Sequence, residues 1–396
     1  MASETKPLLA EEPSIPPGTS YFAHLSLSLS FSASQRLTTA TAAPSSVPGS
    51  ASSSTPARRL PQAIAHRGFK ALYPENTLLA FRGALDAGAH ALETDLHLTR
   101  DGVVVLSHDG NLKRCFGVDR RISECDWDYL RTLRTVQEPG EGMPRLEDLL
   151  AFLAKGGAGR ERVWVLLDIK TDDPPVELLE RVAEVLVSTP GPVPWEERIV
   201  LGCWNQPYIT HVRSILPTYP VTLISWSPFY ARGFLSPAEP NLSFNMFQKS
   251  LVGPAGKLFI RDVRKAGRRL FVWTVNDEEW MEWSIRAGAD GVITDDPELF
   301  LEVCRRWEGR ETAAAAAGHR SGSVVGDVAA GEESDDTKAA RRAGRVRDGT
   351  WRRTLRLYLE IVGVQVLVAV FTPVLMLVAR FGVVAPGPST TKALRL

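Results

Sequence analysis

Short apolar runs rich in β-branched residues alternate with amphipathic segments between residues 60 and 308. Strand-like runs separated by helical segments are typical of a parallel sheet covered by helices. The predicted strands are Gln62–His66, Leu92–Leu98, Val163–Ile169, Ile199–Cys203, Val221–Ser225, Leu242–Asn245, Leu270–Val275 and Gly291–Thr294. Helices are expected at Thr77–Ala87, Leu146–Ala154, Pro175–Val187, Gln206–Leu216, Lys257–Lys265 and Asp277–Ala287, with Asn76 as the N-cap of the first and Gly88 at its end. Eight strands alternating with helices over about 250 residues predict an α/β fold, a (β/α)₈ TIM barrel that forms one domain from residue 60 to 308.

One apolar run does not fit the parallel pattern. Val103–Ser107 follows Leu98 after only four residues. A parallel crossover needs a dozen or more residues, so this run is expected to form a hairpin with Asp101-Gly102 as its turn. We interpret it as an extra antiparallel strand in a small insertion after strand 2. The insertion extends to about Gly142 and brings His108 back to the mouth of the barrel.

The N-terminal segment has a different composition. Residues 13–57 carry a single charge, Arg36, and are dominated by Ser, Ala, Thr and Pro. Such a segment cannot bury enough apolar surface to offset its ordering entropy, so residues 1–59 are predicted to be a disordered low-complexity N-terminus. A targeting presequence is the alternative, although Glu4, Glu11 and Glu12 argue against the mitochondrial kind.

A run of nineteen residues without charge, Ile361–Ala379, lies close to the C-terminus. At about 1.5 Å of rise per residue, a helix of this length is long enough to cross the hydrocarbon layer of a bilayer. The sequence therefore predicts a disordered linker with a basic end at 309–350, a membrane anchor in the form of a transmembrane helix at 351–380, and a short tail at 381–396. Pro373 leaves a shallow hairpin open as an alternative, and a buried helix of the barrel domain is another.

Arginines precede this apolar run. Seven of them lie between Arg341 and Arg356, opposed only by Asp348. The positive-inside tendency places this side, and with it the barrel domain, in the cytosol, and the same cluster attracts anionic headgroups; a solvated charge run is the alternative. The ER, the mitochondrial surface and lipid droplets are the candidate membranes. The 46 basic and 46 acidic residues balance, so no nucleic-acid partner is indicated, and four cysteines without a CxxC pair suit a reduced compartment.

Polar side chains gather at the predicted strand ends, where barrels of this kind carry their active sites. The residues at these ends are His66, Glu93, Asp95, Asp168 and Lys170. Glu93 and Asp95 lie two residues apart on one strand and so point to the same face. Such carboxylates repel each other unless a cation lies between them, and with Asp168 they favour one divalent cation, Mg²⁺ or Ca²⁺, over zinc. The alternative is that they form structural salt bridges with Arg67 or Lys170.

Two histidines, His66 and His108, complete this group of residues. Their near-neutral pKa lets one accept and the other donate a proton, although the sequence does not assign the two roles. Arg67 and Lys170 are expected to bind a phosphate, so the groups together predict metal-dependent cleavage of a phosphodiester. Glu75 is expected either to orient a catalytic group or to support a turn. Ordinary structural roles are expected for His90, His97 and His211.

With these residues in place, the chain resembles the glycerophosphodiester phosphodiesterase family over residues 62–300. The motifs that carry the resemblance are HRG at 66–68, PENT at 74–77, LETDLHLTRDG at 92–102, SHD at 107–109, LLDIK at 166–170, WTVN at 273–276 and DGVITDDP at 290–297. The resemblance implies that His66 and His108 are catalytic and that Glu93, Asp95 and Asp168 bind the metal. It also places Lys170 and Trp273 in the site, although Trp273 could equally fill the barrel. The third acid of the family is commonly Glu, so Asp168 is a departure.

Three further stretches are similar to the fungal phosphatidylglycerol phospholipase C branch of that family. They are GCWNQPYI at 202–209, ISWSPFYARGFL at 224–235 and FNMFQKSLVGPAGKLFIRDVRKAG at 244–267. This resemblance implies hydrolysis of phosphatidylglycerol to diacylglycerol and glycerol 3-phosphate, which suits an enzyme anchored in a membrane. The rival functions are a glycerophosphodiesterase that cleaves deacylated glycerophosphodiesters to glycerol 3-phosphate and an alcohol, a lyase-type phospholipase D relative, and a non-catalytic membrane scaffold.

Overall fold

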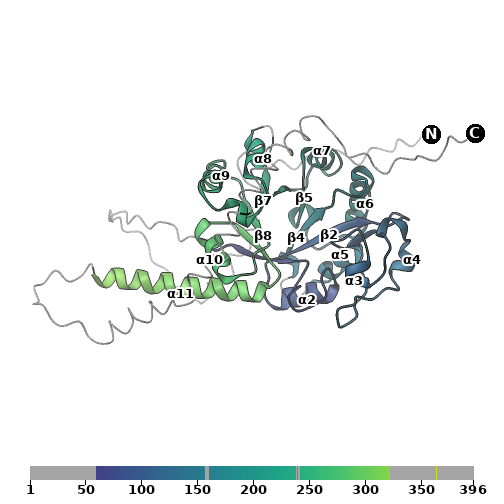
Figure 1. Cartoon of the computed structure of the whole chain (residues 1–396), viewed down its shortest axis with the longest axis horizontal. Coiled ribbons are helices and arrows are strands. Elements are labelled where there is room, and N and C mark those ends of the chain that lie inside the picture. The colour runs from purple at the N-terminus through teal and green to yellow at the C-terminus, as the bar shows by residue number, and fades with distance from the viewer. Residues whose placement is uncertain (1–58, 157–159, 238, 240, 322–362, 364–396) are drawn as a thin grey trace, which may run out of the picture. The chain divides into compact units, whose positions relative to one another are not determined.

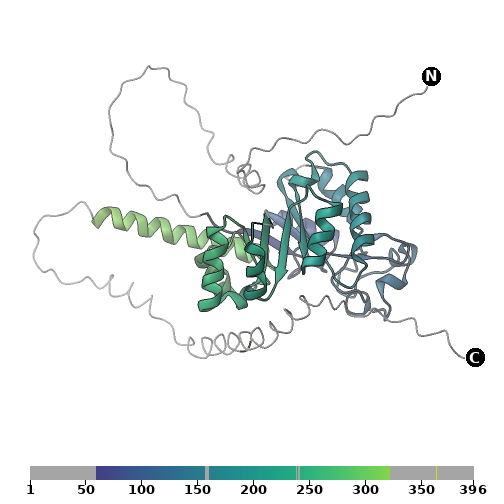
Figure 2. The ribbon, with the colours of Figure 1, turned by 90° about the horizontal axis from the view of Figure 1, so that it is seen from above.

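Eight parallel strands close into a barrel, in which β1 pairs with both β2 and β9. This computed structural model describes residues 59–156, 160–237, 239, 241–321 and 363. Figure 1 shows helices arranged around the strands, and Figure 2 shows the same barrel turned by 90°. The strands are β1 (Gln62–His66), β2 (Ala91–Leu98), β4 (Trp164–Ile169), β5 (Ile199–Cys203), β6 (Val221–Ser225), β7 (Leu242–Phe247), β8 (Leu270–Trp273) and β9 (Gly291–Thr294). The predicted TIM barrel is therefore confirmed.

The strand register sets which polar side chains can meet. His66 at the end of β1 is paired with Glu93 on β2, and Asp95 is paired with Asp168 on β4. Every residue of β2 and β4 is buried. Because neighbouring parallel strands end on the same side of a barrel, this register brings the predicted site residues to one mouth.

The helices that were predicted from the apolar pattern are present. They are α2 (Leu78–Asp86), α5 (Leu146–Ala154), α6 (Pro175–Ser188), α7 (Gln206–Ile215), α9 (Pro254–Lys265) and α10 (Glu278–Ala287). Each buries one apolar face, as α6 does with Leu178, Val182 and Leu186, because helical spacing places these residues on one side. Gly88 follows α2 with a φ of 91°, a conformation that suits glycine. Shorter helices lie in the loops: α3 (Lys113–Phe116), α4 (Trp127–Leu130), α8 (Pro228–Arg232) and five 3₁₀ turns, Ile122–Glu124, Arg160–Arg162, Trp195–Glu197, Gly233–Leu235 and Gln248–Leu251.

The start of α2 corrects one prediction. Thr77 caps this helix, because its backbone is extended and its Oγ1 accepts a hydrogen bond from the Ala80 amide at 3.1 Å. Asn76 instead has a left-handed backbone with a φ of 55°. Its side chain points to β2, where Nδ2 donates to Asp95 Oδ2 at 2.9 Å and Oδ1 accepts from Thr94 Oγ1 at 2.8 Å. Asn76 therefore supports a site residue.

The predicted hairpin and insertion are confirmed. β3 (Val104–Leu106) is antiparallel to β2. Beyond it, Ser107 donates its amide to the carbonyl of Asp95 at 3.1 Å, which returns the chain to the mouth. The insertion has a small apolar cluster of its own, formed by Val105, Leu112, Ile122, Cys125, Leu130 and Met143. This cluster holds the segment that carries His108 against the edge of the barrel.

The linker prediction needs a correction. The last helix, α11 (Pro297–Ser321), extends thirteen residues into the segment 309–350 that was expected to be disordered. A run of alanines at 313–317, the residue with the highest helix propensity, explains the extension. Arg306 and Arg310 also bind Glu278 and Glu282 of α10.

Most of the remaining flank predictions lie outside the described residues. These are the N-terminal segment as far as residue 58, the linker from 322, the apolar run 361–379 apart from Gly363, and the tail. Within the described part of the chain, no helix is both long and apolar enough to span a membrane.

Candidate active site

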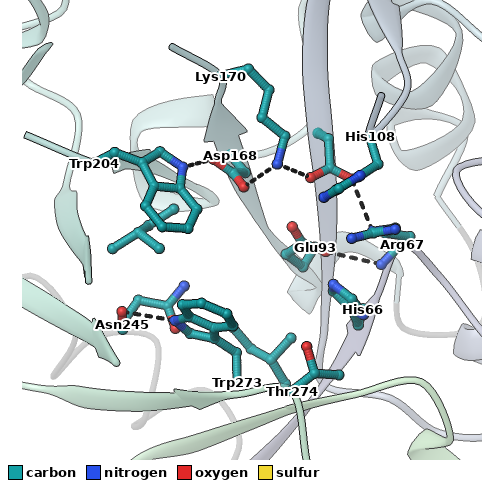
Figure 3. Close-up of a pocket in the computed structure, with 13 residues that line it drawn as sticks. His66, Arg67, Glu93, His108, Asp168, Lys170, Trp204, Asn245, Trp273 and Thr274 are labelled. Atoms are coloured by element: carbon teal, nitrogen blue, oxygen red, sulfur yellow. Dashed lines mark hydrogen bonds and ion pairs between the residues drawn. The ribbon is translucent and has the colours of Figure 1, made fainter. Parts of the chain in front are cut away.

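All eight site residues predicted from the sequence line one cavity at the mouth of the barrel (Figure 3). They are His66, Arg67, Glu93, Asp95, His108, Asp168, Lys170 and Trp273. The same cavity is lined by Trp204, Ile224, Asn245, Thr274 and Ile293. Figure 3 shows the ionisable side chains on one side of it and Trp204, Asn245 and Trp273 on the other.

A tight turn after β1 places Arg67, one of the two cationic side chains of the site. Arg67 and Gly68 have positive φ angles of 57° and 82°. A Cβ atom on Gly68 would come within 2.7 Å of Ala80, so only glycine fits this turn. The turn directs the Arg67 amide to Glu93, whose Oε2 accepts it at 3.0 Å and whose carbonyl accepts it at 2.9 Å. The conformation of HRG therefore joins the end of β1 to the acidic strand β2.

The three predicted metal ligands form a buried cluster. Oxygen atoms of Glu93, Asp95 and Asp168 lie within 4.8 Å of one another. Burial, together with the charges of Asp95 and Asp168, raises the pKa of Glu93 well above its usual value. Burial also raises the pKa of Asp168. All three residues offer carboxylate oxygens, and hard divalent cations prefer oxygen ligands. These residues therefore fit Mg²⁺ or Ca²⁺.

Salt bridges, the alternative to a metal site, are present as well. Lys170 Nζ lies 2.7 Å from Asp95 Oδ1 and 2.7 Å from Asp168 Oδ2, and Arg67 Nε lies 3.2 Å from Asp95 Oδ2. Burial alone would raise the pKa of Asp95, but Lys170 and Arg67 outweigh it and lower that pKa. Two cations therefore face three carboxylates, and Arg67 also pairs with Glu75 at 2.9 Å. The third carboxylate, Glu93, has no cation of its own among the described residues, and its raised pKa shows that it is favoured in the neutral form unless a further cation binds, so the salt bridges leave a place for a metal ion.

Asp295 orients His66. Its Oδ1 lies 2.5 Å from His66 Nδ1, and Asn276 Nδ2 donates to its Oδ2 at 2.9 Å. Burial raises the pKa of Asp295, but the hydrogen bond and charge of His66, followed by the charge of Lys70, bring it down to about 2. The pKa of His66 is lowered, since burial outweighs the opposing effect of Asp295. The lowered pKa favours the neutral imidazole of His66, the form that a general base needs, and Asp295 holds its ring in place.

A chain of ion pairs connects His108 to Arg67. Asp109 Oδ1 lies 2.7 Å from His108 Nδ1, and Asp109 Oδ2 accepts from Arg114 Nε at 2.6 Å. Arg114 also donates to both oxygens of Glu75, at 2.7 and 2.8 Å, and Glu75 accepts from Arg67 Nη1 at 2.9 Å. Of the two roles left open for Glu75, the structure supports orientation of a site residue, namely Arg67.

Aromatic side chains form the part of the cavity wall that follows on from Asp168. The rings of Trp204 and Trp273 meet edge to face with their centroids 5.8 Å apart, and the ring centroid of Phe247 lies 5.3 Å from that of Trp273. Trp204 Nε1 donates to Asp168 Oδ1 at 2.8 Å, and Trp273 Nε1 donates to the carbonyl of Asn245 at 3.0 Å. Trp273 thus lines the cavity with its ring fixed and is more than barrel filling.

Sequence reasoning missed Asp295, Trp204, Asn245, Thr274 and the role of Asn76. Asp295 follows β9, Trp204 follows β5 and Thr274 follows β8, so the strand-end rule that selected His66 could have selected them. Asn245 lies inside β7, and a polar residue within this largely apolar strand could have indicated a side chain that faces the cavity.

Comparison with known proteins identifies the family of the chain. The glycerophosphoryl diester phosphodiesterase family matches residues 66–299. A glycerophosphodiester phosphodiesterase of Caldanaerobacter subterraneus is 28% identical over 253 residues, which cover 61% of this chain and 97% of that protein. A human lysophospholipase D is 27% identical over 269 residues, which cover 61% of this chain and 85% of that protein.

Solved structures support the barrel. A phosphodiesterase from Oleispira antarctica, solved in complex with sn-glycerol-3-phosphate, has 22% identity and a TM-score of 0.54 over 62% of this chain and 97% of its own. A glycerophosphodiester phosphodiesterase from Parabacteroides distasonis has 23% identity and a TM-score of 0.53 over 63% of this chain and 99% of its own. With a family match that spans more than half of the sequence, the chain belongs to the glycerophosphoryl diester phosphodiesterase family and is a phosphoric diester hydrolase.

Proposed function

We propose that this chain cleaves a membrane glycerophospholipid in the manner of a phospholipase C, with phosphatidylglycerol as the substrate and diacylglycerol and glycerol 3-phosphate as products. The observation that carries the chemistry is the joining of His66 and His108 with three buried carboxylates and two cations in one cavity. The alternative substrate is a deacylated glycerophosphodiester, which the same groups would cleave to glycerol 3-phosphate and an alcohol.

In the proposed reaction, Arg67 and Lys170 bind the phosphate and stabilise charge on its oxygens. His66 accepts the proton of the nucleophile, because burial favours its neutral form and Asp295 orients its ring. The nucleophile is either water or the headgroup's own 2-hydroxyl; in the second case water then opens the cyclic phosphate to give glycerol 3-phosphate. His108 donates a proton to the leaving alkoxide; its side chain is 37% exposed at the mouth, where a lipid leaving group would extend. A divalent cation held by Glu93, Asp95 and Asp168 would supply Lewis-acid stabilisation of the phosphate.

Replacing Asp295 with Asn is expected to lower kcat/KM by about 10²–10⁴-fold, because the ring of His66 loses its orientation and the partner that stabilises its charged form. Asp295 raises the pKa of His66, so the acid limb of the pH profile is expected to move to lower pH in the variant. Asp296→Asn is the matched control, since Asp296 only caps α11 through the Leu299 amide and Asn also caps helices. An acid limb that moves to higher pH would contradict this assignment.

Several features favour a lipid substrate. The charge-free run at 361–379 and the arginines before it suit attachment to a membrane. Four of the large exposed apolar side chains, Leu72, Val176, Phe229 and Leu258, lie on segments that follow the carboxyl ends of β1, β4, β6 and β7. The human relative carries the name lysophospholipase D. We infer that the barrel mouth faces the lipid, with the domain on the cytosolic side of an ER, mitochondrial or lipid-droplet membrane.

The cavity also suits a glycerol headgroup. Asn245 Oδ1 is buried and has no hydrogen-bond partner among the described residues, although Asn245 lines the cavity. A buried acceptor left unpaired is costly, and a substrate hydroxyl would satisfy it. The tryptophans beside it provide apolar faces for the carbon atoms of a small polyol.

Product analysis tests this proposal. The full-length protein is incubated with phosphatidylglycerol vesicles and, separately, with glycerophosphocholine, each with and without a chelator. We expect diacylglycerol and glycerol 3-phosphate from the vesicles, a loss of turnover with chelator, and turnover lowered by about 10²–10⁴-fold in the His66→Ala variant. Turnover of glycerophosphocholine alone would favour the soluble-substrate alternative, a cyclic phosphate as final product would favour a lyase, and no turnover of either substrate would leave a non-catalytic role.

A further inference from the structure

His97 lies just behind the candidate active site. It follows Asp95 by two residues on β2 and is 2% exposed, but it does not line the cavity. Its Nδ1 lies 2.6 Å from Asp173 Oδ2, and its Nε2 lies 3.3 Å from the carbonyl oxygen of His108. His97 therefore contacts the backbone of a proposed catalytic residue on one side and a buried carboxylate on the other.

Asp173 is fixed in place by two other elements. Its Oδ1 accepts the Leu98 amide of β2 at 3.3 Å, and its carbonyl accepts the hydroxyl of Tyr208 on α7 at 3.2 Å. A carboxylate and a carbonyl can only accept hydrogen bonds, so both nitrogens of His97 must donate. The ring of His97 therefore connects two loops: it binds Asp173 in the loop after β4 and the main chain of His108 in the loop after β3.

The His97 contact adds to the few that hold the main chain of His108 itself, since the hairpin strand β3 is only three residues long and ends at Leu106. A Cβ atom on Gly110 would lie 2.8 Å from Asp172 Oδ2 and 3.4 Å from His97 Cε1, so the loop passes directly over them. Asp109 holds the ring of His108 through Nδ1, whereas His97 holds its main chain. The two contacts together fix both ends of the residue.

We propose that His97, supported by Asp173, is a positioning residue for His108: it sets the depth at which the His108 ring enters the cavity. The proposal rests on the catalytic role of His108 proposed above. A second metal site is the competing explanation, because His97, Asp172 and Asp173 present ligand atoms within 4.8 Å of one another. The contact of Nε2 with the carbonyl oxygen of His108 links the ring to the segment that carries His108, which favours the positioning role.

A double-mutant cycle in the full-length protein tests the proposal. In the wild-type background, His97→Gln is expected to lower kcat by about 10–100-fold with KM changed less than about twofold, since a displacement of about 1 Å costs on this order. In the His108→Ala background, the same substitution is expected to change the residual rate less than about twofold, because His97 acts only through His108. Asp173→Asn, which keeps an acceptor for the Leu98 amide, is expected to reproduce both results.

His90→Gln is the matched control, since His90 also binds a backbone group, the Ala63 amide at 2.9 Å, but lies before β2 at the opposite end of the barrel. The concentration of Mg²⁺ or Ca²⁺ that gives half-maximal activity is expected to be unchanged in His97→Gln. An equal loss in the wild-type and His108→Ala backgrounds would overturn the proposal, as would a shift in the metal requirement or an undiminished kcat. Failure of His108→Ala to lower activity would instead overturn the proposed function.

Discussion

Replacing His66 or His108 with Ala is expected to lower kcat/KM by about 10²–10⁴-fold, the usual contribution of a general acid or base. Both side chains line the cavity, and each has its Nδ1 held by a carboxylate, Asp295 or Asp109. This arrangement leaves Nε2 of each ring to exchange a proton with the substrate. The double variant is expected to be little worse than the weaker single variant, because the two residues act in one reaction.

His211→Ala is the control for these variants, since His211 lies on α7 and does not line the cavity. Thermal unfolding should report a folded protein in every case. Turnover within about threefold of wild type for either cavity histidine would exclude that residue from general acid–base chemistry.

Replacing Asp95 with Asn is the second change with a large expected effect. Asp95 is 1% exposed and lies between Lys170 and Arg67. Because the variant loses a metal ligand, we expect kcat/KM to fall by about 10³-fold. Because it also loses the partner of two buried cations, we expect the free energy of unfolding to fall by about 3–5 kcal/mol. Rates measured over a range of Mg²⁺ and Ca²⁺ concentrations, together with denaturant unfolding, separate the two effects.

Asp128→Asn is the matched control, because Asp128 is exposed and pairs only with Arg131 on the surface. It should change neither activity nor stability measurably. If Asp95→Asn retained wild-type turnover and the wild-type enzyme ignored chelators, the carboxylate cluster would be a set of salt bridges alone.

The shorter acid at position 168 still reaches the cluster. Asp168 has an oxygen within 4.8 Å of ligand atoms from Glu93 and Asp95, and its two oxygens bind Lys170 and Trp204. The departure from Glu therefore does not remove the third carboxylate. The indole of Trp204 contributes a hydrogen bond that the sequence did not indicate.

Strand positions could be predicted from the sequence because burial on both faces of a parallel barrel leaves short apolar runs with sharp polar ends. β1, β5, β6 and β9 have the bounds that the pattern predicts. The predicted N-cap of α2 was wrong because Asn76 has a left-handed backbone and uses its side chain to contact β2. That contact joins residues 19 positions apart in the chain and leaves no local signal in the sequence. The boundary at 308 was wrong because α11 continues by helix propensity and ion pairs beyond the core.

The sequence by itself determined the barrel, the family and the chemical groups, because strand ends carry a local signal in residue type and spacing. Only the tertiary structure decided which groups act on which. Closure of β9 against β1 brings Asp295 to His66 across 229 residues, and the loop after β4 brings Asp173 to His97 across 76. Such pairings depend on strand register and barrel closure, which are set by packing across the whole domain and leave no signal in either segment alone.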